Sequence, residues 1–162
     1  MKNESRPQPV IVGVDGSACS VAALAYGANI ARAMDAPLEA ITTWTYPVLL
    51  DPFDPGLDRL PKKYAELAAR NAIEAAFQGT PPARFSHRVL PGPPREVLVE
   101  LSDDASMLVL GSHGHGGLVG LVLGSVSAAC AAHARCPVLV VHEKDTAALG
   151  VRSQELIIDA AP

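Results

Sequence analysis

Short apolar runs alternate along the chain with longer segments in which apolar residues recur every three or four positions. A short run rich in Val, Ile and Leu, without polar alternation, is typical of a strand buried on both faces of a parallel sheet. The run over 84–90 is more polar, which favours an edge position for that strand. The pattern predicts five strands, over residues 9–15, 38–44, 84–90, 107–111 and 137–141.

Capping and breaking residues predict where the intervening helices begin and end. Ser17 can cap a first helix, which Asp35 and Pro37 close. Pro61 suits the first turn of a second helix, and Gly79 ends it. Further helices are expected over 95–102 and from 125 to 134.

Strands that alternate with helices imply right-handed crossovers. We therefore predict an α/β fold in one domain: an open, doubly wound parallel sheet of five strands, Rossmann-like, with helices on both faces. We expect a flexible N-terminus over 1–8, the domain over 9–142 and a tail over 143–162. The proline-rich loop over 46–60 is either a lid or a simple connection.

Residues 109–125 hold a dense group of glycines between a predicted strand and a predicted helix. Glycine lets backbone amides converge on a bound anion, and a helix start offers unpaired N–H groups and a positive dipole end. The pattern predicts a phosphate-binding loop. Its residues are Gly111, Gly114, Gly116 and Gly117, followed by Gly124 and Ser125.

Three other motifs do not fit this spacing. A Walker A loop needs Gly-Lys-Ser/Thr, and no lysine lies between Lys63 and Lys144. The dinucleotide motif Gly-x-Gly-x-x-Gly has Val119 where its third glycine belongs. A Gly-x-Ser-x-Gly nucleophile elbow occurs nowhere in the chain, which removes the simplest route to an α/β hydrolase.

Composition and charge limit the kinds of binding partner and the cellular compartment that we expect. The 162 residues carry a formal charge of -4 and no run of Lys or Arg, so we expect neither a nucleic-acid nor a membrane partner. No apolar leader and no stretch of about eighteen apolar residues is present, which favours a cytoplasmic protein. Three scattered cysteines suit a reducing compartment.

The glycine spacing does match a known pattern: Gly111-x-x-Gly114, nine residues, then Gly124-Ser125. Val-Gly-Val-Asp15-Gly-Ser stands at the end of the first predicted strand, and Cys136-Pro-Val-Leu-Val-Val stands at the last. With these motifs in this order, the chain resembles the universal stress protein family over residues 9–142, in particular its ATP-binding branch. The resemblance implies the strand order 3-2-1-4-5. Ligands of open α/β sheets bind where the winding reverses, which here lies between strands 1 and 4.

The resemblance also implies roles for individual residues. Gly13 and Asp15 would lie beside adenine and ribose, and backbone near Thr43 would bond the adenine edge. Asp15 has two other interpretations, a ligand of phosphate-bound Mg²⁺ and a plain turn residue. The residues that would wrap the triphosphate are Gly111, Gly114, Gly116, Gly117, Gly124 and Ser125.

Several other residues are open to more than one interpretation. We expect His113 to contact phosphate, as a histidine does in some ATP-binding relatives, and His115 to be a solvated loop residue. Trp44 either packs at a strand end or lines the adenine pocket. The set Cys130, His133 and Cys136 lacks a fourth zinc ligand, so small buried cysteines are favoured over a metal site.

The resemblance predicts an ATP-binding stress-response or signalling module. Because the loop contains neither Lys nor Arg and no evident catalytic base, we expect ATP to be held without fast turnover. The alternatives are a slow ATPase or a phosphoryl- or adenylyl-transfer enzyme, and a cAMP-binding or nucleotide-free stress protein. The resemblance further implies a homodimer through the strand over 137–141.

Overall fold

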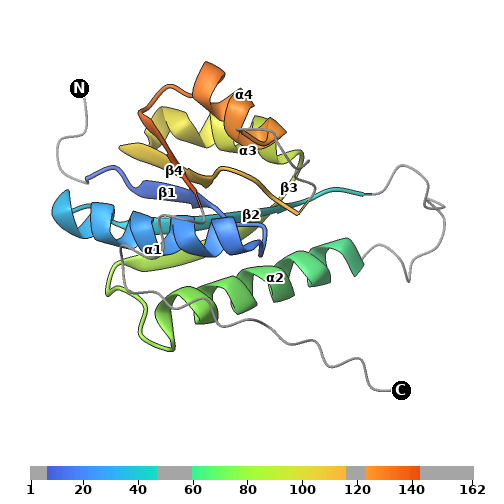
Figure 1. Cartoon of the computed structure of the whole chain (residues 1–162), viewed down its shortest axis with the longest axis horizontal. Helices are drawn as coiled ribbons and strands as arrows, with labels where there is room; N and C mark the ends of the chain where they lie inside the picture. The colour runs from blue at the N-terminus through green and yellow to red at the C-terminus, as the bar shows by residue number, and fades with distance from the viewer. Residues whose placement is uncertain (1–6, 47–59, 116–122, 143–162) are drawn as a thin grey trace.

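One parallel sheet of five strands, in the order β3-β2-β1-β4-β5, forms the centre of the molecule (Figure 1). The computed structural model describes residues 7–46, 60–115 and 123–142. The order and the parallel pairing confirm the predicted doubly wound fold. The strands are β1 (Val10–Gly13), β2 (Leu38–Trp44), β3 (Phe85–Pro91), β4 (Met107–Gly111) and β5 (Val138–Val141).

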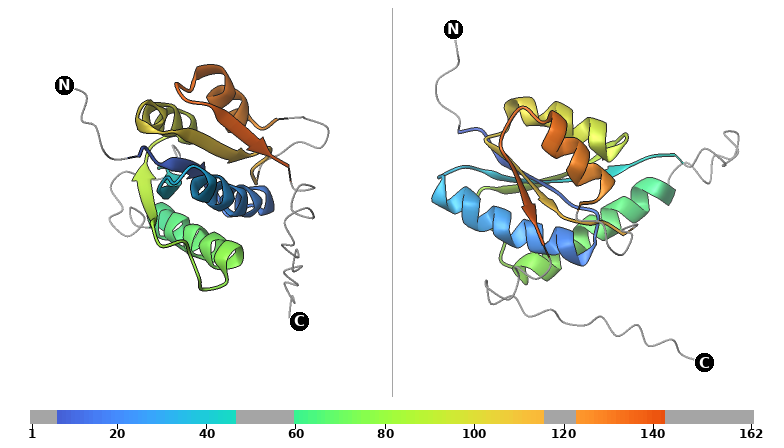
Figure 2. Two further views of the ribbon diagram at one scale, coloured as in Figure 1. Left: turned by 90° about the vertical axis from the view of Figure 1, so that its left-hand side faces the viewer. Right: turned by 45° about the horizontal axis from the view of Figure 1, so that its top comes forward.

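Two helices cover each face of the sheet. On one face lie α1 (Ala18–Ala33) and α2 (Leu60–Phe77), and on the other lie α3 (Pro94–Leu101) and α4 (Ser125–His133) (Figures 1 and 2). A single 3₁₀ turn, η1 (Ser102–Asp104), follows α3. On each face, the sheet and its two helices enclose a separate apolar core.

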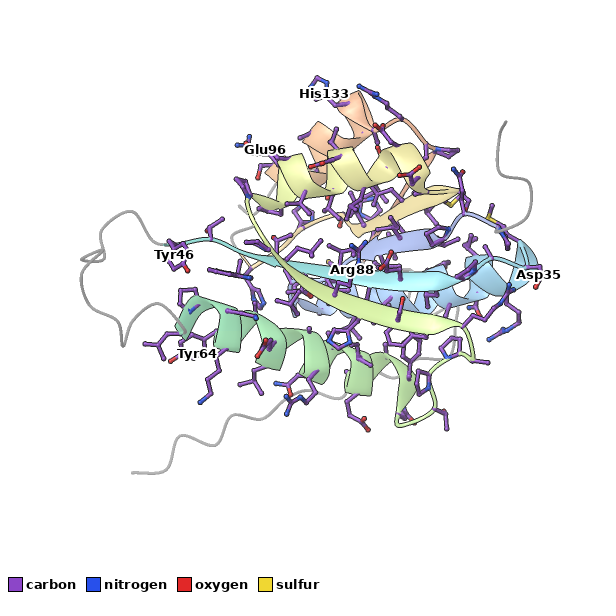
Figure 3. The ribbon with its side chains drawn as sticks, turned by 180° about the vertical axis from the view of Figure 1, so that it is seen from behind. Asp35, Tyr46, Tyr64, Arg88, Glu96 and His133 are labelled. Atoms are coloured by element: carbon purple, nitrogen blue, oxygen red, sulfur yellow. The ribbon has the colours of Figure 1, made fainter. Side chains whose placement is uncertain are left out.

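The sequences of the two central strands β1 and β4 lack polar alternation because both faces of these strands are buried. Val10 and Val12 of β1 and Leu108 and Val109 of β4 are all 0% exposed, because helices cover both of their faces. The edge strand β3 is more polar, as predicted, and its Arg88 pairs with Glu39 of β2, Nε to Oε1 2.6 Å (Figure 3).

Helix ends follow the predicted caps closely. Ser17 caps α1, since its hydroxyl accepts a hydrogen bond from the Ser20 amide at 3.2 Å. Asp35 closes this helix with φ of +49°, and Gly79 follows α2 with φ of +82°, a backbone conformation that glycine adopts readily. α2 begins at Leu60, one residue before the expected Pro61. α3 begins and ends one residue earlier than expected, because Ser102 already belongs to the 3₁₀ turn.

The strand β1 ends two residues before Asp15, where prediction had placed its end. The Val14 amide still bonds Ile41 O at 2.8 Å, but the chain then turns at Gly16, whose φ is +87°. Residues 1–6 of the expected N-terminal segment, the whole C-terminal segment and nearly all of the loop over 46–60 lie outside the described residues. Among the helices that the structure describes, none has the length and apolar character needed to cross a membrane.

Candidate functional site

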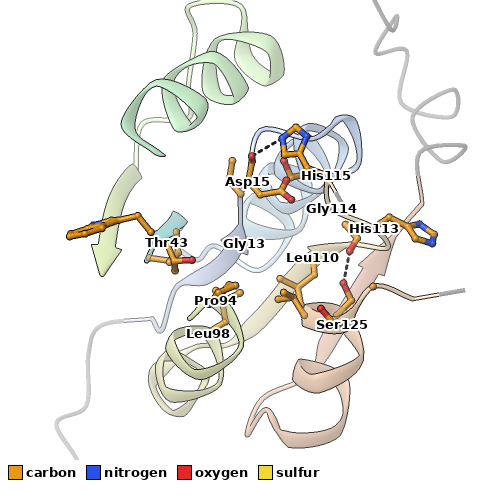
Figure 4. A pocket seen from close by; sticks show the side chains of 18 of the residues that line it. Gly13, Asp15, Thr43, Pro94, Leu98, Leu110, His113, Gly114, His115 and Ser125 are labelled. Atoms are coloured by element: carbon orange, nitrogen blue, oxygen red, sulfur yellow. Dashed lines mark hydrogen bonds between the residues drawn. The ribbon is translucent and has the colours of Figure 1, made fainter. Parts of the chain in front are cut away.

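Parallel strands bring the candidate residues to one edge of the sheet. Gly13 of β1 lies beside Ile41 of β2, and Val12 lies beside Val109 of β4. Two or three residues further along each chain, Asp15, Thr43 and Ser112 therefore reach the same edge. They meet at the point where the winding direction of the sheet reverses, between β1 and β4 (Figure 4).

A cavity of about 530 Å³ opens at this edge, a size in the range of small-molecule sites. Its lining comes from the ends of β1, β2 and β4 and from the first turns of α3 and α4. Gly116 and Gly117 lie outside the described residues. The other predicted site residues all line the cavity: Gly13, Asp15, Thr43, Gly111, His113, Gly114, Gly124 and Ser125.

One end of the cavity is largely apolar, and the residue-by-residue predictions missed most of it. Ile41 of β2, Leu98 of α3 and Leu110 of β4 line this part, with Pro94 at the start of α3 (Figure 4). The sequence feature that could have identified this part of the cavity is the position of Pro94. A helix that follows a parallel strand after a short turn begins at the carboxyl edge of the sheet, where ligands bind.

Trp44 packs at the strand end, as one of its interpretations expected, and also lines this cavity. Its ring lies edge-on to Tyr46 with a centroid distance of 4.9 Å. Its Nε1 is buried and has no hydrogen-bond partner among the described residues. A buried N–H without an acceptor is costly, so this donor favours a polar ligand atom or water nearby.

Asp15 has a structural contact on one oxygen and faces the glycine loop with the other. Its Oδ1 accepts hydrogen bonds from the Ser17 amide at 2.9 Å and from the Ser17 hydroxyl at 2.5 Å. These bonds give Asp15 the turn role considered from sequence. A Cβ on Gly114 would lie 2.4 Å from Oδ2, so only glycine fits beside this carboxylate as it stands.

Gly111 and Gly13 are glycines for reasons of packing. A Cβ at Gly111 would lie 2.7 Å from Cys19 Cβ and 2.8 Å from the Cys19 carbonyl carbon, so β4 approaches α1 closely here. A Cβ at Gly13 would lie 2.7 Å from a methyl group of Leu110. Both residues line the cavity, and their lack of a side chain is explained by these neighbours.

The first turn of α4 faces the cavity with its backbone amides. Gly124 is the N-cap and is held against the glycine loop by a 2.6 Å hydrogen bond from its amide to Ser112 O. The first amides of a helix have no partner within the helix, and this end of its dipole is positive. Ser127 uses its hydroxyl on Gly111 O at 2.6 Å, whereas Ser125 is exposed. The helix start is thus positioned to receive an anion.

The two histidines of the glycine loop both line the cavity. His113 lines the cavity, and its Nδ1 lies 3.0 Å from Ser112 Oγ. His115 is exposed, as expected of a solvated loop residue, and its Nε2 also lies 3.0 Å from Asp15 O, a contact that the sequence did not predict. The described lining includes Asp15 and contains neither Lys nor Arg, which leaves backbone amides, hydroxyls and the two histidines as its polar groups besides this carboxylate.

Cys130 of α4 and Cys136, two residues before β5, pack in the apolar core on this face of the sheet. Cys130 is 0% exposed, and burial together with the neighbouring Cys136 raises the pKa of its thiol to about 11. Burial also raises the pKa of the Cys136 thiol. No group of three or more metal-ligating side chains occurs among the described residues.

Comparison with known proteins gives one family. The model of the universal stress protein family matches residues 7–142. A universal stress protein of Mycobacterium bovis is 36% identical over 136 residues, which are 83% of this chain and 45% of that protein. The chain thus spans about half the length of the curated relatives it matches.

Solved structures agree with this match. The universal stress protein UspA from Lactobacillus plantarum superposes with a TM-score of 0.71 at 24% identity, over 85% of this chain and 99% of that one. A universal stress protein solved in complex with cAMP has a TM-score of 0.58 at 34% identity, over 86% and 99%. The matched motifs, the strand order and these likenesses lead to one conclusion: the chain belongs to the universal stress protein family.

Proposed function

We propose that the cavity binds an adenine nucleotide, with ATP as the ligand, and that the chain acts as a nucleotide-binding stress-response or signalling module. One observation carries the proposal: a single cavity joins an apolar slot to a helix start and a glycine loop. A nucleotide has the matching division, with a flat base at one end and anionic phosphates at the other.

The base would occupy the apolar end. Ile41 and Leu98 are buried at 1% and 3% exposure, and with Leu110 they offer a rigid apolar surface for a planar ring. The carboxyl end of β2 around Thr43 lies at the rim of this slot. Its backbone can supply the polar contacts that orient a base.

The phosphates would occupy the other end, where Gly114 and the first turn of α4 lie. Amides from a glycine loop and a helix start suit phosphate oxygens without any cationic side chain. Ser125, exposed at the first position of α4, adds a hydroxyl donor. Gly116 and Gly117 would extend this set of amides.

Asp15 fits a role beside a phosphate-bound Mg²⁺. Its Oδ1 already accepts two hydrogen bonds, whereas Oδ2 faces Gly114 at the phosphate end. One carboxylate oxygen together with phosphate oxygens is a common ligand set for Mg²⁺. When bound, the ion would offset the repulsion between this carboxylate and the nucleotide.

Holding the nucleotide is better supported than turning it over. Rapid phosphoryl transfer calls for cationic groups on the developing charge and a positioned nucleophile. The described lining offers amides, hydroxyls, two histidines and Asp15. Slow hydrolysis or group transfer remains the enzymatic alternative.

A second candidate ligand is cAMP. The 34% identical solved relative was crystallised with it. A single cyclic phosphate would need fewer amides than a triphosphate and would leave part of the glycine loop unused.

Native mass spectrometry of freshly purified protein and calorimetry with ATP, AMP and cAMP, each with and without Mg²⁺, test the proposal. We expect ATP to be carried through purification and to bind more tightly with Mg²⁺ than without. If cAMP binds more tightly than ATP, the proposed ligand is wrong and the proposed site stands. No uptake of any of the three would refute the proposal.

We also propose a homodimer through β5, and a cytoplasmic location that suits the three free cysteines. The carbonyls of Pro137 and Val141 bond to β4, so by alternation the backbone groups of Val138 and Val140 point away from the sheet. An edge of this kind pairs readily with a second copy across a two-fold axis.

A further inference from the structure

We propose that His115 is a positioning residue, whose ring holds the glycine loop against the turn between β1 and α1 and so keeps the phosphate end of the cavity in shape. This inference rests on the proposed nucleotide binding. It gives a specific task to a residue that sequence reasoning had left in solvent.

The first observation is the bond between His115 and Asp15. Nε2 lies 3.0 Å from the backbone oxygen of Asp15, and the two residues are 100 positions apart in the chain (Figure 4). A carbonyl oxygen only accepts hydrogen bonds, so Nε2 must carry the proton. The contact therefore selects one ring orientation and one donor nitrogen.

The second observation is the tight packing of Gly16 beneath that ring. Gly16 has φ of +87°, and a Cβ there would lie 3.5 Å from His115 Nε2 and 3.2 Å from the Cβ of Ala68 in α2. Gly16 thus lies close to both α2 and the imidazole. A ring seated against a fixed turn holds its own backbone in place.

The third observation is that adjacent loop residues contact the same turn. Gly114 faces the carboxylate of Asp15, and His115 bonds the carbonyl of the same residue. The start of the loop is anchored separately, by the Ser112 amide on Val141 O at 2.8 Å. His115 therefore ties the loop to the β1 side of the cavity, while Ser112 ties it to β5.

This second tie matters because a phosphate would need the amides near Gly114 and those of α4 at the same time. A loop held in its binding geometry loses less conformational freedom when the ligand arrives. Loss of the tie should weaken affinity without removing any direct ligand contact. That behaviour distinguishes a positioning residue from a ligand-binding one.

The test uses the whole chain and ATP with Mg²⁺ in calorimetry. His115→Leu removes the donor and keeps the bulk, and should weaken binding about five-fold, the effect of one hydrogen bond. His115→Gln keeps an N–H donor of similar reach and should restore most of the affinity. His87→Leu, a histidine on the exposed edge strand β3, is the matched control and should leave binding unchanged.

A readout without nucleotide separates this inference from the proposed function. Hydrogen exchange of residues 111–115 should be faster than in the wild type for His115→Leu and match the wild-type rate for His115→Gln, with the melting temperature of the free protein unchanged in both. If the wild type binds ATP and His115→Leu binds it equally well, the inference is wrong and the function stands. If the wild type takes up no nucleotide, the function fails, and equal exchange rates in all variants would then refute the inference as well.

Discussion

Gly124→Val is the substitution that most directly tests the phosphate end of the cavity. Gly124 has φ of −71° and ψ of 164°, an extended backbone conformation that valine adopts without strain. A Cβ there would lie 3.3 Å from Ser112 O and 3.6 Å from His113 Cα. The valine methyl groups would therefore project over the gap between α4 and the glycine loop, where phosphate would have to enter.

The expected loss can be worked from the contacts at stake. If the methyl groups keep a phosphate from two amides, two charge-assisted hydrogen bonds are lost, together about 3 kcal/mol. This loss corresponds to a dissociation constant for ATP that is roughly 100-fold higher. Folding should suffer less, because replacing a glycine N-cap with valine costs about 1 kcal/mol.

Calorimetry with ATP and thermal melting without it separate the two effects. Gly79→Ala is the matched control: Gly79 has φ of +82° and lies far from the cavity lining, with no atom within 4 Å of the added Cβ. Its backbone strain should lower stability by about 1 kcal/mol and leave affinity intact. Equal ATP affinity in Gly124→Val and wild type would refute this account of the phosphate site.

The structure supports four further predictions. Gly114→Lys should displace the Asp15 carboxylate, which lies 2.4 Å from the added Cβ, and calorimetry should find ATP binding abolished while circular dichroism stays unchanged. Val140→Pro removes an outward N–H of β5 that edge strands can lose, so light scattering should find a monomer where the wild type is a dimer; a wild-type monomer would contradict the proposed dimer. Native alkylation should label Cys136 and spare the fully buried Cys130, and labelling of Cys130 at the same rate would be evidence against its burial. Because the pKa of Cys130 is about 11 instead of 9.0, the unfolded chain releases this proton first, and stability in denaturant titrations should fall as pH rises from 9 to 11.

Much of the fold was predictable because it depends on interactions between residues that are close together in the sequence. The bounds of β2 and β4 agree with prediction to the residue, because Pro37 precedes β2 and β4 is a short apolar run that ends in the glycine loop. The cap at Ser17 is a contact within one turn, which a short segment of sequence specifies. The strand order came from the family resemblance, since no local pattern determines which strands become neighbours.

The site was less predictable where it depends on distant contacts. Leu98 enters the cavity because α3 packs over β2 and β4, which its own helical pattern does not reveal. The bond from His115 to a backbone oxygen leaves no trace in sequence, because any residue has a carbonyl there. The glycine spacing assigned Gly111 to phosphate binding, whereas in the structure a side chain at this position would clash with Cys19.

The position of Trp44 gives the chain a built-in optical reporter. The sequence has one tryptophan, and its ring lines the cavity with an indole N–H that has no acceptor among the described residues. All indole emission therefore originates at the edge of the candidate site. A ligand that fills the cavity changes the polarity around that one ring, so occupancy can be followed in the unmodified protein by its own fluorescence.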